Sequence, residues 1–436
     1  MKHLLLAMAW FLLPALTSAA SFETPVRITD ADTTSPAGLS RSSAGSLLWT
    51  RDDKLTLVYY DGGQEASFGD QPSHVWLRQW SAAGGWAARE LLSQSYYNAE
   101  EMGGRHPAVV EREDGTLFAF WHDYRNRSDA GPYDIEIYGD SRPAGGSFSS
   151  TDQRLTSSGA IHGGDNGYVP KAAVLPDGRI ALVWYDFHWN PGVSEICLRL
   201  SDASGRFGAP PAMDSLRLTD AADRYDGNAA TLFTMPAVAA TSGTLHLCWA
   251  TGTGSNPQLY YGRVNAGTGE LVESTRIATN AAGYYDPAKI LAAPDGAVWL
   301  VYTLHDEALG DEILACRRPA GAASFEAAVK LVTGYGSQLQ PMAVFDKAGL
   351  MHLVYVDTLG ASRVVYRVYD PAAAAVTEEK TLTAGGGGWQ RPAIALDGRG
   401  GIYVVWEEEV SSTLGRLWFA WSQPPKNAVV DWTAYD

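Results

Sequence analysis

Cysteine, positive charge and long apolar segments are all scarce in this chain. Its 436 residues hold three cysteines, Cys197, Cys248 and Cys316, each inside an apolar, β-like segment. An odd number without metal-ligand spacing excludes a complete disulfide pairing and a cysteine zinc site. We expect all three to be buried as small apolar residues.

Acidic residues outnumber basic ones, 49 against 33, which gives a formal net charge of −16. This balance argues against nucleic acid and against an anionic membrane surface as partners. Beyond residue 20 no uninterrupted apolar segment reaches the roughly 18 residues of a membrane span, so no membrane insertion is expected. Phosphate-binding glycine loops, nucleophile elbows and EF-hand spacing are missing, so we expect no cofactor and no metal. The Asp-rich loops leave Ca²⁺ open as an alternative.

The first twenty residues have the pattern of a signal peptide. Residues 2 and 3 are basic, residues 4–16 are apolar, and the small residues 17–20 follow. Cleavage after Ala19 or Ala20 satisfies the requirement for small residues before the cut. We therefore expect an exported protein that is periplasmic or extracellular.

A β-rich segment that ends in an aromatic residue recurs seven times. The aromatics are Tyr59, Trp121, Trp184, Trp249, Tyr302, Tyr355 and Trp406. Their spacing of roughly 50–65 residues is typical of a repeat architecture. The alternation of apolar and polar residues is that of strands rather than helices. Repeats made of strands alone predict a β-propeller, in which these aromatics are buried between sheets.

The repeats predict an all-β fold, one seven-bladed β-propeller over residues 21–430, followed by a tail at 431–436. The expected blades are 39–93, 104–157, 167–220, 233–279, 285–333, 339–384 and 389–422. The last repeat has three strands and no fourth. A segment at residues 26–29 has the pattern of an outer strand, so we expect this N-terminal strand to complete the last blade and close the ring.

Antiparallel pairing brings the start of each first strand and the end of each second strand to one face of the ring. Aromatic and polar residues gather in the loops of this mouth: His106, Tyr168, Asp186, His188, Trp189, Tyr225, Tyr285, Trp389 and Arg391. Aromatic planes beside planar polar groups suit sugar recognition. Alternatively, these aromatics pack the loops and the charged groups are solvated. An Asp recurs two residues after the aromatic in four repeats, including Asp186, and this recurrence favours a turn-capping role.

The second repeat resembles the first catalytic blade of sialidases and their BNR-repeat relatives, most clearly over residues 104–140. It contains Arg105-His-Pro-Ala-Val-Val, then Asp-Gly-Thr-Leu-Phe-Ala-Phe, then Arg125-Asn-Arg-Ser-Asp129. The resemblance implies that Arg105 binds a carboxylate, that Arg125 is the loop arginine and that Asp129 is the general acid. The chain departs from the family in having seven repeats rather than six. It also has no arginine at the second expected position and no identified Tyr–Glu nucleophile pair.

Three functions remain open. The first is an exported, monomeric propeller that recognises a glycan or an extracellular or cell-surface protein through its mouth without chemistry. The second is an exo-acting, sialidase-like glycoside hydrolase with Asp129 as acid, so whether the chain is an enzyme stays undecided. The third is a structural envelope scaffold that docks onto a partner chain.

Overall fold

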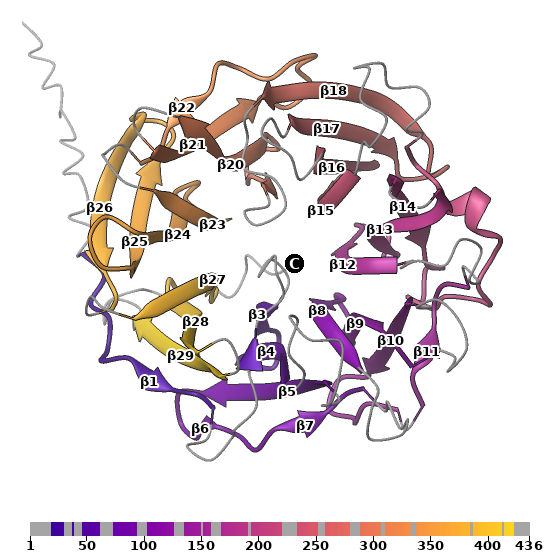
Figure 1. Cartoon of the computed structure of the whole chain (residues 1–436), viewed down its shortest axis with the longest axis horizontal. Helices are drawn as coiled ribbons and strands as arrows, with labels where there is room; N and C mark the ends of the chain where they lie inside the picture. The colour runs from indigo at the N-terminus through magenta and orange to yellow at the C-terminus, as the bar shows by residue number, and fades with distance from the viewer. Residues whose placement is uncertain are drawn as a thin grey trace, which may run out of the picture.

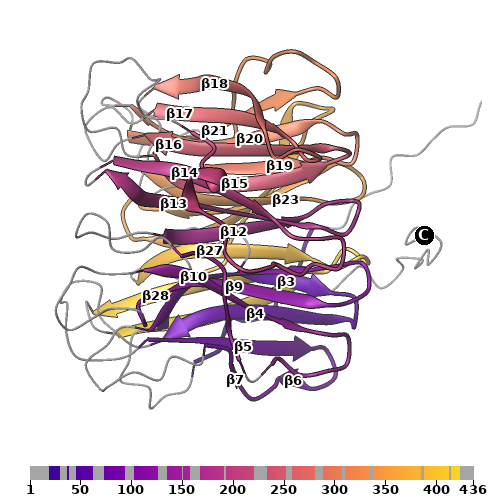
Figure 2. The same cartoon turned by 90° about the vertical axis from the view of Figure 1, so that its right-hand side faces the viewer.

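The repeats fold into seven antiparallel sheets arranged in a ring (Figure 1). The computed structural model describes residues 19–29, 37–38, 46–61, 73–93, 103–125, 135–149, 151–157, 167–190, 193–219, 233–251, 258–279, 288–306, 310–332, 337–383, 387–411 and 414–422. The strands run from one face of the ring to the other, so the connections between them lie on these two faces (Figure 2). The chain is a seven-bladed β-propeller, as the repeats predict.

The first three blades differ in their outer strands. Blade 1 contains β3 (Leu47–Thr50), β4 (Lys54–Asp61), β5 (His74–Ser81) and β7 (Glu90–Leu91), with β2 (Ala37–Gly38) beside β4 and β6 (Gly85–Trp86) beside β5. Blade 2 contains β8 (Gly104–Glu111), β9 (Leu117–Asp123), β10 (Glu136–Arg142) and β11 (Gln153–Arg154). Blade 3 contains β12 (Gly167–Val174), β13 (Ile180–Asn190) and β14 (Val193–Leu200), followed by the 3₁₀ turn η1 (Met213–Leu216). In blade 3 a single bridge, Cys197 to Arg217, takes the place of an outer strand.

The next three blades have four strands each. Blade 4 contains β15 (Phe233–Thr241), β16 (Thr244–Thr251), β17 (Gln258–Asn265) and β18 (Leu271–Thr279). Blade 5 contains β19 (Lys289–Ala292), β20 (Val298–Asp306), β21 (Gly310–Arg318) and β22 (Val329–Lys330). Blade 6 contains β23 (Gln338–Phe345), β24 (Met351–Asp357), β25 (Arg363–Asp370) and β26 (Ala375–Thr381).

The last blade combines the two ends of the described chain. Its strands β27 (Gly388–Leu396), β28 (Ile402–Ser411) and β29 (Leu414–Ser422) are joined by β1 (Val26–Arg27). Val26 pairs with Phe419, and the Ile28 N–H donates to the Leu417 carbonyl at 2.8 Å. The N-terminal strand therefore supplies the outermost strand of blade 7.

The core consists of apolar layers between neighbouring blades rather than one central cluster. Seven buried clusters occur among the described residues, one at each junction between consecutive blades. Successive residues of one strand serve different layers, since Ala119 packs toward blade 1 while Phe120 packs toward blade 3. This explains why the second strands are apolar on both faces.

All seven repeat aromatics are buried, as predicted, and Trp121 and Trp184 are 0% exposed. Cys197, Cys248 and Cys316 are free and buried in these layers, as expected. In the part of the chain that is described, no helix has the length and apolarity needed to cross a membrane.

Tight turns fix the hairpins on the face opposite the mouth. In the β8–β9 turn the Asp114 carboxylate accepts the Thr116 N–H at 3.0 Å, and Gly115 has a φ of 78°. The same Asp-Gly arrangement recurs between β12 and β13 and between β19 and β20. Glycine adopts this left-handed conformation without the steric cost that a side chain would meet.

Candidate functional site

Strand register brings two sets of loops together on one face, which we call the mouth face. Gly104 at the start of β8 pairs with Asp123 at the end of β9, and Gly167 of β12 pairs with Asp186 of β13 in the same way. Equivalent pairs occur in blades 4, 6 and 7. Segments that enter the first strands and leave the second strands therefore meet, as antiparallel pairing predicts.

Each of five innermost strands carries a β-bulge near the mouth face. The register of the ladder shifts beside a residue that precedes proline and has a positive φ of 48–56°: His106, Val169, Met235, Gln340 and Arg391. A bulge bends its strand and redirects the side chains next to it. Positive φ is costly for residues other than glycine, so five equivalent occurrences indicate a conformation that the blades enforce.

The recurrent aspartates accept hydrogen bonds from the turns that follow the second strands, and Asp186 is one of them. The Asp186 carboxylate is 0% exposed and accepts the His188 backbone N–H at 2.9 Å and the Trp184 indole N–H at 3.0 Å. Asp123 accepts the corresponding bonds from Arg125 and Trp121. Asp186 therefore holds the turn after β13 and fixes the buried indole beneath it.

Arg125, the loop arginine of the resemblance, is held inside blade 2 by two carboxylates. Its Nη2 donates to the carboxylates of Asp123 and Asp152, both at 2.6 Å. Its guanidinium lies 4.0 Å from the centroid of the Tyr138 ring. Burial disfavours the charged form, but the two carboxylates outweigh this effect and raise the pKa of Arg125. The charge of Arg125 is therefore balanced within the blade.

Arg105, in contrast, keeps hydrogen-bonding capacity. Its side chain is 3% exposed, and Nε donates to Ser73 Oγ of blade 1 at 3.2 Å. The guanidinium carbon lies 5.7 Å from the centroid of the Tyr124 ring. Among the described residues, the buried Nη2 atom has no hydrogen-bond partner. A buried guanidinium with an unsatisfied donor is costly unless an acceptor reaches it.

A group of aromatic and imidazole rings adjoins Arg105. The His106 ring lies 4.9 Å from that of His122 and 5.5 Å from that of Tyr60 in blade 1. The His122 ring contacts Tyr168 of blade 3 edge-on at 5.3 Å. His122 Nδ1 accepts the Val169 backbone N–H at 3.2 Å, so the neutral ring carries its proton on Nε2. The two imidazoles of blade 2 and the phenols of Tyr60 and Tyr168 therefore form one group of rings at the bulge that carries Arg105 and His106.

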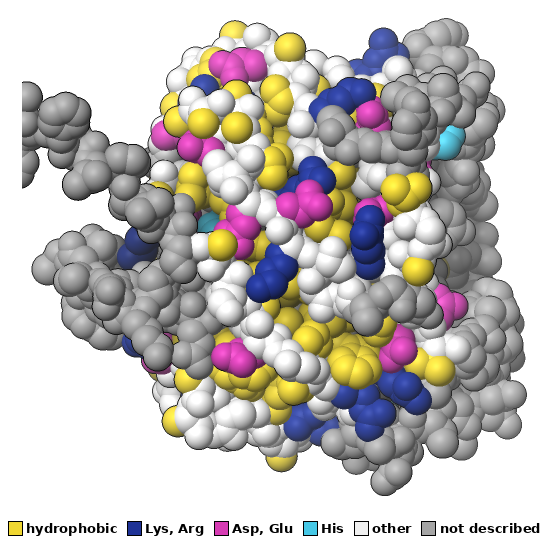
Figure 3. Space-filling view, turned by 90° about the vertical axis from the view of Figure 1, so that its left-hand side faces the viewer, with side chains coloured by type: hydrophobic (Ala, Val, Ile, Leu, Met, Phe, Trp, Pro, Cys, Tyr) yellow, Lys and Arg dark blue, Asp and Glu magenta, His cyan; other side chains and the backbone are white. Residues whose placement is uncertain are grey.

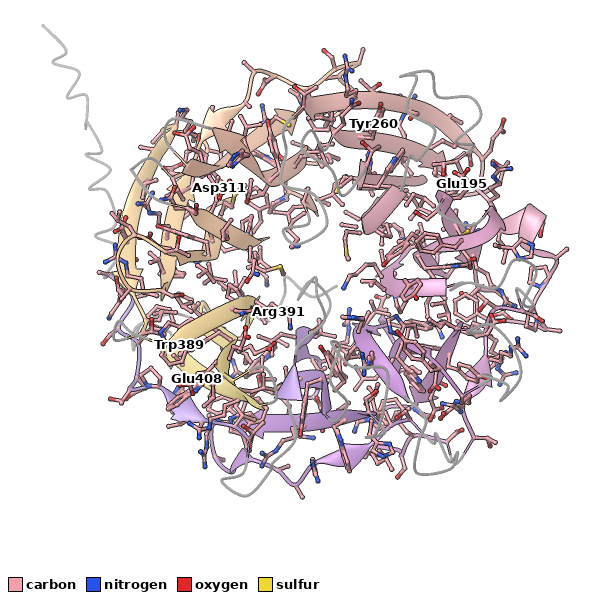
Figure 4. All side chains as sticks on the ribbon, viewed as in Figure 1. Glu195, Tyr260, Asp311, Trp389, Arg391 and Glu408 are labelled. Carbon is pink, nitrogen blue, oxygen red and sulfur yellow. The ribbon has the colours of Figure 1, made fainter. Side chains whose placement is uncertain are left out.

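A second polar group, around Arg391, lies in blade 7. Arg391 Nη1 pairs with the Glu407 carboxylate at 3.1 Å, and the Arg391 backbone N–H donates to Gln340 Oε1 of blade 6 at 2.6 Å. Figure 4 shows Arg391 on the innermost strand, with Trp389 and Glu408 farther out. The Trp389 ring packs edge-on against Trp418 at 6.1 Å. Arg391 joins blades 6 and 7, and Trp389 packs within its own blade.

Only some of the other predicted site residues lie within the described part of the chain. Asp129, Tyr225 and Tyr285 lie outside the described residues, and so does the Trp189 side chain, although its backbone belongs to β13. The half-buried His188 follows the Asp186 cap on β13. The structure thus brings together Arg105, His106 and Tyr168 from the predicted set, and Arg391 lies on a different blade.

Two buried lysines were missed by the sequence reasoning. Lys171 of β12 and Lys289 of β19 are each 3% exposed on innermost strands of blades 3 and 5. Burial lowers the pKa of Lys171 well below its usual range, and the positive charge of Lys289 adds to this effect. Each could have been noticed in the sequence as a lysine inside an otherwise apolar first strand, where a small or branched residue is the rule.

The described residues hold no group of three or more His, Cys, Asp or Glu side chains placed to bind a metal ion. Several of the Asp-rich loops fall outside the described ranges. The Ca²⁺ alternative therefore stays a prediction.

No protein-family model and no curated protein sequence matches the chain. Solved structures do match it. A PL25 ulvan lyase bound to -[GlcA(1-4)Rha3S]- superposes with a TM-score of 0.60 at 11% identity, covering 88% of this chain and 93% of the lyase. The BP39L lectin from Burkholderia pseudomallei gives 0.55 at 10% identity, covering 88% and 98%. A protein of unknown function from Dyadobacter fermentans gives 0.53 at 14% identity, covering 93% and 99%.

These similarities confirm the expected resemblance at the level of the fold. Sialidases also match, among them NanB of Streptococcus pneumoniae with a TM-score of 0.47 at 12% identity, covering 95% of this chain and 70% of that one. A similarity this weak carries no argument about residues or chemistry. The site must therefore be judged on its own geometry.

Proposed function

We propose that this propeller is exported and recognises an acidic glycan at its mouth face, with Arg105 binding a sugar carboxylate. The observation that carries the proposal is the buried Arg105 guanidinium, whose Nη2 has no partner among the described residues. A carboxylate is the planar acceptor that a guanidinium fork matches best. The lectin and the lyase of the same fold are named for glycans, which supports this class of ligand.

The rings beside Arg105 suit the rest of a sugar. Tyr124 lies next to the guanidinium, and Tyr168 is stacked on Tyr185 with ring centroids 5.3 Å apart. Aromatic planes pack against the C–H faces of pyranose rings, while imidazoles bond to hydroxyls. The net charge of −16 repels polyanions at long range, so recognition depends on these local contacts.

The test is titration calorimetry with oligouronates, sialosides and neutral oligosaccharides of equal length. We expect the wild type to bind one acidic class, and Arg105→Ala to weaken that binding by about 30-fold or more, as expected when one member of a buried charge pair is removed. Arg105→Lys should restore little, because an ammonium lacks the fork geometry. Arg51→Ala, at an exposed arginine of the opposite face, is the control. Unchanged binding by Arg105→Ala, or a preference for neutral sugars, would refute the proposal.

A second candidate function, eliminative cleavage of a uronate polymer, is favoured by His122, which pairs with Arg105 across the β8–β9 ladder and contacts the rings of His106 and Tyr168. In such a reaction Arg105 neutralises the carboxylate, and an imidazole or phenolate removes the proton from the adjacent carbon. The glycosidic oxygen at the next carbon leaves with a proton from a second acid. The product sugar gains a carbon–carbon double bond, and no water is consumed.

Four outcomes distinguish the functions. Ultraviolet absorbance of the conjugated double bond, lost in His122→Ala, would establish elimination. New reducing ends without that absorbance, lost in Asp129→Asn, would instead establish the hydrolase. Binding without either product leaves a lectin-like propeller, and no binding at all leaves the structural scaffold.

A further inference from the structure

The start of β5 in blade 1 lies against the start of β8 in blade 2. Ser73 immediately precedes β5, at the mouth face, since His74 pairs with Asp61 at the end of β4. The Ser73 side chain is 0% exposed, and its Oγ accepts the Arg105 Nε–H at 3.2 Å. Among the described residues, Nε is the only nitrogen of the Arg105 guanidinium that makes a hydrogen bond. Ser73 therefore provides the one hydrogen bond that joins this guanidinium to blade 1.

The backbone on either side of Arg105 is fixed by close packing. A Cβ added at Gly104 would lie 2.7 Å from Cδ1 of Trp121 and 2.9 Å from Cγ2 of Val75 in blade 1. His106 follows with a φ of 49°, within the bulge of β8. A bulge sets the direction in which the neighbouring side chain leaves the strand. What remains to be determined at Arg105 is the orientation of its guanidinium plane.

A guanidinium has two places at which a carboxylate binds through two N–H groups. Nε and Nη2 form one edge, and Nη1 and Nη2 form the tip. Ser73 Oγ occupies Nε, so the edge keeps one donor, whereas the tip keeps both. The Nη2 atom, common to both places, is buried and has no partner among the described residues. Two-point binding of a planar carboxylate is therefore left to the tip.

The partner of Arg105 differs from the partners of arginines on the outer strands. Arg367 and Arg416 pair with the carboxylates of Glu379 and Glu408. On the outer side of the ring seen in Figure 3, Lys and Arg side chains likewise lie among Asp and Glu side chains. Within the described ranges Arg105 forms no ion pair, and its hydrogen bond goes to a neutral hydroxyl. Ser73 therefore orients the guanidinium without neutralising its charge.

We propose that Ser73 is a positioning residue of the carboxylate site. By accepting the Arg105 Nε–H it fixes the plane of the guanidinium, so that a sugar carboxylate is bound end-on by Nη1 and Nη2. The inference rests on the proposed function, in which Arg105 binds that carboxylate. The ligand then contacts Arg105 of blade 2, while the orientation of Arg105 is set from blade 1. The carboxylate site belongs to the junction between the two blades and not to blade 2 alone.

A double-mutant cycle tests whether Ser73 acts through Arg105. Calorimetric titration of the full chain with oligouronates and sialosides gives the affinity of each variant for the acidic sugar. Ser73→Ala should weaken this binding about 3- to 10-fold, because loss of the hydrogen bond lets the guanidinium rotate. In the Arg105→Ala background the same substitution should change the affinity less than about twofold, since no guanidinium is left to orient. An equal loss in both backgrounds, or no loss in either, would overturn the proposal.

Two further variants separate the Ser73 hydroxyl from its surroundings. Ser73→Thr keeps an acceptor at this position and should retain more of the wild-type affinity than Ser73→Ala. Ser93 is the matched control, because it is also a 0% exposed serine of blade 1, but its Oγ accepts the Val75 backbone N–H at 2.9 Å. Ser93→Ala should lower the Tm and leave the affinity for the acidic sugar unchanged. A loss of affinity equal to that of Ser73→Ala would contradict the positioning role.

Crystal structures of the ligand-free wild type and of Ser73→Ala distinguish a failure of this inference from a failure of the proposed function. If Ser73 positions Arg105, the guanidinium plane should be rotated in the variant relative to the wild type. The same orientation in both structures refutes the positioning role even where the wild type binds acidic sugars. A wild type that binds no acidic sugar refutes the proposed function and the end-on carboxylate, whatever orientation the guanidinium adopts.

Discussion

At the scale of single residues, the buried carboxylates of blade 2 differ in whether a positively charged side chain pairs with them. Asp123 and Asp152 both pair with Arg125, so each has a positively charged partner. Asp140 is 9% exposed, and its Oδ2 has no hydrogen-bond partner among the described residues. Burial and the nearby Asp152 raise the pKa of Asp140 to about 6. Asp140 is therefore a carboxylate whose ionisation opposes folding.

This predicts a stability gain at neutral pH for Asp140→Asn. Because the pKa of about 6 in the folded state exceeds the ordinary value of 3.8, the folded state binds the proton more tightly, and this contribution to stability falls as pH rises from about 4 to 6. Asp140→Asn should raise the free energy of unfolding by about 1–2 kcal/mol at pH 7.5, with the gain vanishing below pH 4. Urea denaturation at several pH values measures this. Asp123→Asn should have the opposite sign at pH 7.5, since it breaks the pair with Arg125.

At the scale of elements, close approach of the third strand to the second depends on glycine in blades 2 and 4. Gly139 of β10 pairs with Phe120, and Gly262 of β17 pairs with Leu247. A Cβ added at Gly262 would lie 2.6 Å from Cζ3 of the Trp249 indole. That indole is 1% exposed and packs in the layer between blades 3 and 4. The strand has no room for a side chain at this point.

We therefore expect Gly262→Ala to destabilise the propeller by about 1–3 kcal/mol, because overpacking forces the indole or the strand to move. Thermal unfolding followed by tryptophan fluorescence would report both the lower Tm and the changed environment of Trp249. Gly208→Ala is the control, since no atom lies within 4 Å of an added Cβ there. Equal effects of the two substitutions would contradict the packing argument.

The turns and bulges differ in how well they could be predicted from the sequence. The conformation of a hairpin turn such as Asp114-Gly115 is determined by the two residues of the turn, so the sequence predicts it. The bulges of the first strands are different, although the recurring residue before proline, as in His106-Pro107, is visible in the sequence. Proline restricts the preceding residue toward extended conformations, so local rules do not predict a φ of 49° at His106. That conformation comes from the neighbouring strands.

The candidate site depends on contacts between residues that are far apart in the sequence, and the spacing of motifs does not predict such contacts. Asp152 lies 27 residues from Arg125 in the chain, and the ion pair between them is not visible in the sequence. Tyr60 reaches His106 from another blade. The fold and the mouth face could be predicted from the sequence, because they depend on repeat period and strand direction. The sequence did not rank the mouth residues, because their roles depend on partners in other repeats.

At the scale of the whole molecule, the ring depends on the first described residues packing against the last blade. Ile28 is 3% exposed and belongs to the apolar layer between blades 7 and 1. Val26, two residues earlier in the same segment, is 40% exposed. Ile28→Ala should therefore cost about 2–4 kcal/mol, whereas Val26→Ala should cost well under 1 kcal/mol. Urea denaturation of both variants measures the difference. Similar losses of unfolding free energy would show that packing of Ile28 does not stabilise the closed ring.

The position of β1 in blade 7 also determines when folding can be completed. Thr29 accepts a hydrogen bond from Leu417, 388 residues later in the chain. Contacts of such sequence separation form slowly, because the whole intervening chain must first be ordered. A chain emerging from the ribosome cannot form this contact until almost all of it has been synthesised. The propeller therefore remains an open ring, with two unsatisfied blade faces, until its last blade has formed.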